Sequence, residues 1–94
     1  MVKTTGTEPR LGQKVLSKQG RDAGATFLIV GLQSDDYVLV ADGQKRSINR
    51  PKKKNRKHLS LTLQVAEGIA EKLAVRDRVT DEEIVDAIRC LREK

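Results

Sequence analysis

Three short runs of apolar and β-branched residues occupy the first half of the chain. LGQKVLSK (11–18) sets Val15 and Leu16 among polar neighbours, whereas TFLIVG (26–31) and YVLVA (37–41) are almost continuously apolar. Runs of this length, rich in Val and Ile and separated by polar segments, are typical of β-strands. The two continuous runs predict strands with little exposed surface.

The segments around these runs predict how the strands connect. The glycines of QGRDAG (19–24) permit the positive φ values of a tight turn. Asp42-Gly43 favours a two-residue hairpin, so we expect QKRSIN (44–49) to return as a fourth strand. Pro51 marks an edge or a break, and a fifth strand is expected around 58–59. Short strands at this spacing predict an antiparallel meander that curls into a small SH3-like barrel.

The apolar period changes at Ser60. Within 61–74, Val65, Ile69 and Leu73 recur at four-residue spacing, which predicts one face of a helix. A second helix is expected after Thr80, because Thr80 and Glu83 have the spacing of a capping box and Ile84, Ile88 and Leu91 then form an apolar stripe. Neither stripe is wide enough to be stable alone, so the helices should pack on each other or on the barrel.

The chain is therefore expected to be mainly β with a C-terminal α part. The expected organisation is a flexible N-terminal tail (1–10), an SH3-like barrel (11–60) that includes a basic arm (50–58), and two amphipathic helices (61–94).

The net charge of +6 is distributed unevenly along the 94 residues. Residues 1–60 carry thirteen Lys and Arg against five Asp and Glu, net +8, whereas residues 61–94 carry six against eight, net −2. A basic domain attracts polyanions such as RNA, DNA or an anionic membrane. No apolar run of about twenty residues and no signal-peptide pattern occurs. We therefore expect a cytoplasmic protein without a membrane partner.

Candidate catalytic residues are scarce. His58 lies in a basic run, where a phosphate or edge-strand contact is more expected than a general base. Cys90 is the single cysteine, and Asp35-Asp36 has the setting of a turn that caps backbone amides. No nucleotide-binding signature of the P-loop or Rossmann kind is present. We expect no enzymatic activity, no cofactor, no metal site and no small-molecule substrate.

The segments GRDAG, VADG and RPKKKNRKHL together resemble the KOW-domain family, specifically the small bacterial RNA-binding proteins related to the large-subunit ribosomal KOW proteins of archaea and eukaryotes. The resemblance covers about residues 11–60. It places the central glycine of the motif at Gly24, with Gly20, Arg21 and Asp22 in the preceding loop, and Ala23 stands where many members carry lysine. The resemblance implies an SH3-like barrel, RNA as the ligand and a ribosomal or translation-linked setting.

The residues themselves also predict a polyanion-binding surface. Pro51 biases Arg50 toward an extended conformation, so the following lysines can alternate between two sides of a strand and follow phosphates along RNA. A solvated linker and a nuclear-import signal are alternative interpretations of the same run. The expected RNA-binding residues are Lys14, Lys18, Arg21, Lys45, Arg46, Arg50, Lys52, Lys53, Lys54, Arg56, Lys57 and His58.

The low aromatic content indicates how RNA would be bound. Phe27 and Tyr37 are the only aromatic residues, and both lie in strands expected to be buried. Single-strand readers stack bases on exposed aromatics, so structured RNA recognised by shape and phosphate is expected, with ribosomal RNA first. Charge alone does not distinguish RNA from DNA. The alternative from another class is a protein-interaction module that binds ribosomal, translation or transcription proteins.

Overall fold

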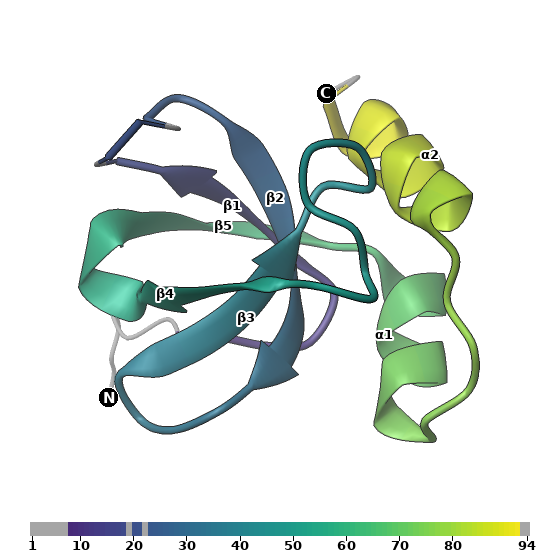
Figure 1. Cartoon of the computed structure of the whole chain (residues 1–94). Helices are drawn as coiled ribbons and strands as arrows, with labels where there is room; N and C mark the ends of the chain where they lie inside the picture. Colours follow the sequence, from purple (N-terminus) through teal and green to yellow (C-terminus); the bar gives the residue numbers. More distant parts are fainter. Residues whose placement is uncertain (1–7, 19, 22, 93–94) are drawn as a thin grey trace.

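Five strands and two helices make up the chain in the computed structural model, which describes residues 8–18, 20–21 and 23–92 (Figure 1). Residues 1–7, which are most of the expected N-terminal tail, and Asp22 of the glycine-rich turn lie outside the described residues.

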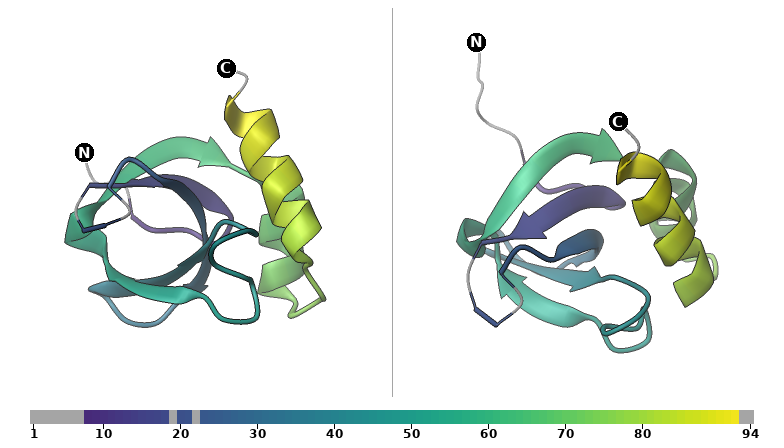
Figure 2. Two further views of the ribbon diagram at one scale, coloured as in Figure 1. Left: turned by 45° about the horizontal axis from the view of Figure 1, so that its top comes forward. Right: turned by 90° about the horizontal axis from the view of Figure 1, so that it is seen from above.

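The strands form one antiparallel sheet. They are β1 (Gln13–Ser17), β2 (Thr26–Leu32), β3 (Tyr37–Ala41), β4 (Lys52–Asn55) and β5 (Leu59–Val65), and a 3-10 turn, η1 (Arg56–His58), joins the last two. Their order is β4-β3-β2-β1-β5, so β4 and β5 form the edges. The sheet curls strongly without closing into a barrel (Figure 2). The expectation of a mainly β fold with C-terminal helices is confirmed.

The middle of the sheet is buried on both faces. On the inner face, the cluster of Val15, Phe27, Ile29, Val38, Val40 and Leu59 fills the curl. On the outer face, Leu28 and Ala41 pack against Ile69, Val79 and Ile84 of the helical part. Strands that are covered on both sides need apolar residues on both sides. This explains why the β2 and β3 sequences are continuously apolar.

The helices α1 (Glu67–Ala74) and α2 (Asp81–Arg92) cover the outer face of the sheet (Figure 1). The expectation that helical structure begins after Ser60 is wrong, because residues 61–65 continue β5, which crosses the expected domain boundary at residue 60. LSLTLQV alternates apolar and polar residues with period two, the pattern of a strand. That alternation competes with the helical spacing of Val65, Ile69 and Leu73.

The expected capping box opens α2. The Glu83 N–H donates to Thr80 Oγ1 at 3.2 Å, and the Thr80 N–H donates to Glu83 Oε1 at 3.0 Å. Glu83 also accepts a hydrogen bond from Lys72 of α1, which lowers the pKa of Glu83, with a further contribution from the Thr80 amide. The Glu83 side chain therefore takes part in the N-terminal cap of α2 and also links α2 to α1.

The expected fourth strand at 44–49 is wrong. Residues 42–51 form a loop, and the strand that pairs with β3 is β4. The loop folds around Asp42, because Asp42 Oδ1 accepts hydrogen bonds from the Gln44 and Arg46 amides at 2.9 and 2.8 Å. A side chain that accepts hydrogen bonds from two amides of the loop favours this wider loop over a two-residue hairpin.

Asp81 fastens the same loop to α2. Its carboxylate accepts one hydrogen bond from the Ser47 hydroxyl at 2.8 Å and another from the Ile48 N–H at 2.6 Å. Gly43 lies so close to α2 that a Cβ there would be 2.5 Å from the Asp81 carbonyl oxygen, and its φ is +82°. Only glycine fits this contact without displacing the backbone.

Arg76 ends α1 in the left-handed conformation. Its φ is 61°, and the Asp77 N–H donates to the Lys72 carbonyl at 2.7 Å while the Arg76 N–H donates to Leu73 at 3.2 Å. This is the Schellman pattern, in which glycine is the preferred residue. The side chain of Arg76 is exposed.

We expect Arg76→Gly to raise the free energy of unfolding by about 0.5–1 kcal/mol, because relief of left-handed strain exceeds the added chain entropy. Urea denaturation followed by circular dichroism measures the change. Arg78→Gly, an exposed site without positive φ, is the control and should not stabilise. An Arg76→Gly protein no more stable than the parent would contradict the strain argument.

Candidate nucleic-acid interface

Four of the expected RNA-binding cations meet at one end of the sheet. Arg21 comes from the β1–β2 turn, Lys45 and Arg46 from the 42–51 loop, and Lys52 from the start of β4. They line an open groove of about 670 Å³ whose floor is formed by Ala25 and Phe27. We call this the cationic groove; its lining residues are Arg21, Ala23, Ala25, Phe27, Asp42, Lys45, Arg46 and Lys52.

Strand register brings these segments together. Leu28 of β2 pairs with Ala41 of β3, so the β1–β2 turn and the 42–51 loop leave the sheet at the same end. Val40 pairs with Lys52, which places the Lys52 side chain on the inner face beside the groove floor. The convergence follows from the topology, and residues distant in sequence become neighbours.

The groove is strongly positive. Its lining includes four cations and a single acid, Asp42, which is already engaged with two loop amides. Arg21, Lys45 and Arg46 are exposed, so their charged groups can reach a ligand in solvent. Clustered cations above a low-dielectric floor create a favourable potential for an anion.

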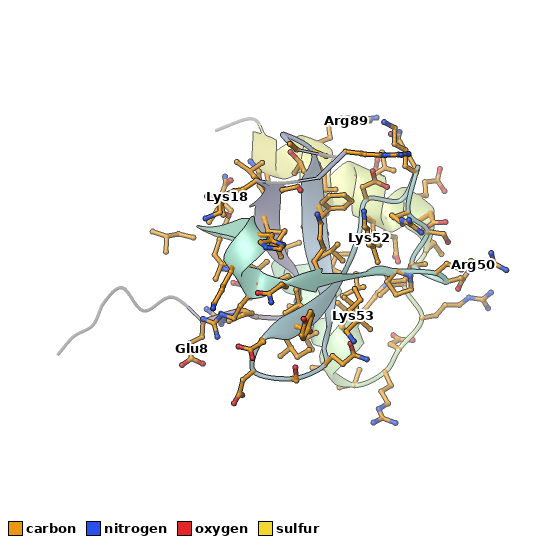
Figure 3. All side chains as sticks on the ribbon, turned by 60° about the vertical axis from the view of Figure 1, so that its left-hand side comes forward. Glu8, Lys18, Arg50, Lys52, Lys53 and Arg89 are labelled. Carbon is orange, nitrogen blue, oxygen red and sulfur yellow. The ribbon has the colours of Figure 1, made fainter. Side chains whose placement is uncertain are left out.

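The lysines of β4 alternate between its two faces, as Figure 3 shows for Lys52 and Lys53. Lys53 lies on the outer face, with its Nζ 4.7 Å from the centre of the Tyr37 ring. Lys54 points inward, is 7% exposed and donates a hydrogen bond to Ser17 Oγ at 3.1 Å. Lys54 is therefore part of the sheet interior, and its expected place on the RNA-binding surface is wrong.

The basic run 50–58 is neither a projecting arm nor a linker. Residues 52–55 are an integral strand paired with β3, and residues 56–58 form η1. Arg56 braces the β2–β3 turn, because its backbone N–H donates to Asp36 and its guanidinium to the Asp35 carbonyl. Arg50 projects from the 42–51 loop away from the body of the protein (Figure 3).

The other expected residues lie outside the cationic groove. Lys18 and Lys57 are exposed, and the Lys18 N–H donates to the His58 carbonyl at 2.8 Å, which brings the end of β1 next to η1. Lys14 donates to Gln64 Oε1 at 3.0 Å, and Gln64 in turn donates to the Leu91 carbonyl of α2. Lys14 therefore links β1 and β5, and through Gln64 the end of α2.

The motif glycines have the backbone conformation expected of them. Gly20 and Gly24 both have φ of +91°. A side chain at Gly24 would meet no heavy atom within 4 Å, so the constraint there is conformational and the space in front of the turn is open.

A second groove of about 410 Å³ lies between α2 and the same end of the sheet. We call it the helix groove; its lining residues are Gly24, Thr26, Asp42, Gln44, Val85, Ile88 and Arg89. Neither Arg89 nor Asp42 is among the residues that the sequence predicts at a binding surface. Arg89 matched the preference for cations near a helix C-terminus and Asp42 matched a turn signal, so both already had local explanations.

Among the described residues, no three His, Cys, Asp or Glu side chains gather as a metal site. No helix in the described part of the chain is long and apolar enough to cross a membrane.

The fold and the grooves define a small, basic sheet protein in which four cations gather at the end of the sheet where the 42–51 loop meets α2. No family model matches the sequence. The chain is 37% identical over 71 residues to a Bacillus subtilis (strain 168) protein named "Putative ribosome-binding protein YbzG", an alignment that covers 76% of this chain and 96% of that protein. The chain belongs to the same family as that protein.

The inward position of Lys54 predicts that its side chain contributes more to the free energy of unfolding than that of its exposed neighbour Lys53. Lys54→Ala should lower the free energy of unfolding by about 2 kcal/mol or more, because it removes a buried stem and a buried hydrogen bond. Lys53→Ala, the matched control, should cost only about 0.5–1 kcal/mol, the value of an exposed cation–π contact. Equal losses in urea denaturation would show that Lys54 is not held inside the sheet.

Proposed function

We propose that this protein is a non-enzymatic RNA-binding protein that associates with the ribosome and binds structured ribosomal RNA. The observation that carries the proposal is the convergence of Arg21, Lys45, Arg46 and Lys52 on one open groove. The name of the B. subtilis relative, "Putative ribosome-binding protein YbzG", supports the ribosomal setting and with it a cytoplasmic location.

Phosphate is the chemical group that the cationic groove suits best. Each Lys or Arg that neutralises a phosphate releases condensed counterions from the RNA, and this release drives binding. Lys18 follows β1 and Lys57 lies in η1, and both are exposed. These two segments lie next to each other, so the two lysines extend the positive surface beyond the cationic groove. Contacts from separate loops can then follow one RNA backbone.

The aromatic residues favour recognition by shape. Phe27 is 2% exposed, as expected, whereas Tyr37 is 38% exposed and has the Lys53 ammonium over its ring. Proteins that read extended single strands need a row of exposed aromatic rings. The protein would instead bind helical or compactly folded RNA, mainly through phosphates.

The KOW resemblance and an SH3-like arrangement of the curled, open sheet are part of the proposal. A curled antiparallel sheet, a 3-10 turn before β5 and a glycine-rich β1–β2 turn support it. Arg21 of that turn lines the cationic groove, as the resemblance implies for a loop that contacts RNA.

A protein-interaction module is the second candidate. Leu63, on the edge strand β5, is 90% exposed, and an edge strand can accept a further strand from a partner. Binding of that kind depends on backbone hydrogen bonds and apolar contact, so it would respond weakly to salt.

A charge-matched pair of variants tests the proposed function. We expect the double variant Arg21→Gln, Lys45→Gln to reduce the slope of log affinity against log salt by roughly 1.4 to 1.8, the loss of two phosphate contacts. Arg10→Gln, Arg76→Gln removes the same charge from exposed residues outside both grooves and should leave the slope nearly unchanged. Fluorescence anisotropy with ribosomal RNA, and sedimentation with ribosomes at low and high salt, provide the measurements.

Equal slopes for the two double variants would assign binding to overall charge and contradict a specific cationic groove. Ribosome binding that persists at high salt would favour the protein-interaction module.

A further inference from the structure

We propose that the helix groove holds one unpaired RNA base while the cationic groove holds the phosphate next to it. This inference rests on the proposed RNA binding and gives α2 a direct part in it.

The two grooves lie on opposite sides of a single chain segment. Ala23, Ala25 and Phe27 line the cationic groove, whereas Gly24 and Thr26 line the helix groove. Thr26 and Phe27 begin β2 and point to opposite faces of the sheet, and the turn at 23–25 continues this division. Asp42 lines both grooves, so residues 23–27 form a ridge between two adjoining depressions.

The ridge is low enough for a nucleotide to lie across it. Gly24 lies at its exposed end, and no heavy atom lies within 4 Å of the position that a side chain there would occupy. The flanking Ala23 and Ala25 are small. A ribose can therefore rest on the ridge with its base on one side and its phosphate on the other.

The helix groove has the lining that a base requires. Val85 and Ile88 of α2 offer an apolar wall against a flat ring, and Arg89 brings a guanidinium that can stack on it. The ion pair of Arg89 with Asp86 is long, with 3.9 Å between Nη1 and Oδ1, and the Arg89 side chain is 71% exposed. Arg89 can therefore turn toward a ligand. The volume of about 410 Å³ lies within the range of small-ligand sites, about 300–1,000 Å³.

Asp42 gives the site a preference among bases. Its Oδ1 accepts the Gln44 and Arg46 amides, and Oδ2 can accept a hydrogen bond from a ligand. A carboxylate matches the amino groups of cytosine, adenine and guanine, whereas the carbonyl oxygens of uracil repel it. Asp42 lines both grooves, but the helix groove has one cation, Arg89, whereas the cationic groove has four. Phosphate therefore favours the cationic groove, which orients the nucleotide.

Nuclear magnetic resonance titration of the full-length protein with mononucleotides tests the site without an identified RNA. We expect 5′-CMP to shift the amides of Gln44, Val85 and Arg89 in addition to those of the cationic groove. Ribose 5-phosphate, which has no base, should shift the cationic groove alone. 5′-UMP should bind about threefold or more weakly than 5′-CMP, because it lacks the amino donor.

The variant Asp42→Asn changes the proposed contact with the base but keeps the hydrogen bonds that fold the 42–51 loop. The amide retains an oxygen for the Gln44 and Arg46 N–H groups but presents N–H donors to the base. We expect the preference for 5′-CMP over 5′-UMP to be lost or reversed. Glu82→Gln removes the same charge from an exposed residue of α2 that lines neither groove, and it should retain the parent's preference.

Shifts confined to the cationic groove, identical for 5′-CMP, 5′-UMP and ribose 5-phosphate, would overturn the base site and leave the proposed RNA binding intact. A preference that survives Asp42→Asn would overturn the assignment of Asp42. Failure of all three probes to shift either groove, together with no binding to ribosomes, would instead contradict the proposed function itself.

Discussion

The hydrogen bonds from the 42–51 loop to Asp81 are the constraint on which the cationic groove depends. Ser47 and Ile48 donate to one carboxylate at the start of α2, and Gly43 packs against the same turn of helix. The loop carries Lys45 and Arg46, so its attachment to α2 places two of the four groove cations. An acid at a helix N-terminus is also favoured by the helix dipole, so the attachment and the helix start stabilise each other.

Burial of β2 and β3 on both faces makes the helices part of the same structural unit as the sheet. Ile84 of α2 is fully buried against Leu28 and Ala41. Without the helices, the outer face of these strands would be exposed to water and the 42–51 loop would lose its anchor. Residues 61–94 have a negative net charge, but α2 places Arg89 at the end of the sheet where the β1–β2 turn and the 42–51 loop meet. The net charge is therefore compatible with the proposed position of α2 beside RNA.

Much of the fold could be predicted from local patterns, and the errors have physical causes. The strands β1 to β3 and the capping box of α2 follow from apolar runs and from the Thr80–Glu83 spacing. β4 was missed because Asp42-Gly43 matches a hairpin signal, whereas the Asp42 side chain stabilises a longer loop. The sequence predicted all four cations of the cationic groove as binding residues. The inward direction of the Lys54 side chain depends on its pairing with Val38, and the position of Arg89 depends on the packing of α2. Neither is a local property.

Site-specific photocrosslinking on ribosomes tests most directly whether the junction of loop and helix faces RNA. A p-benzoylphenylalanine in place of Gln44, which is exposed and lines the helix groove, should crosslink to ribosomal RNA on irradiation. The same photoreactive residue in place of Arg10, an exposed position that lines neither groove, should give little RNA crosslinking. Crosslinks from the Gln44 position only to ribosomal proteins, or equal RNA crosslinking from both positions, would contradict the account.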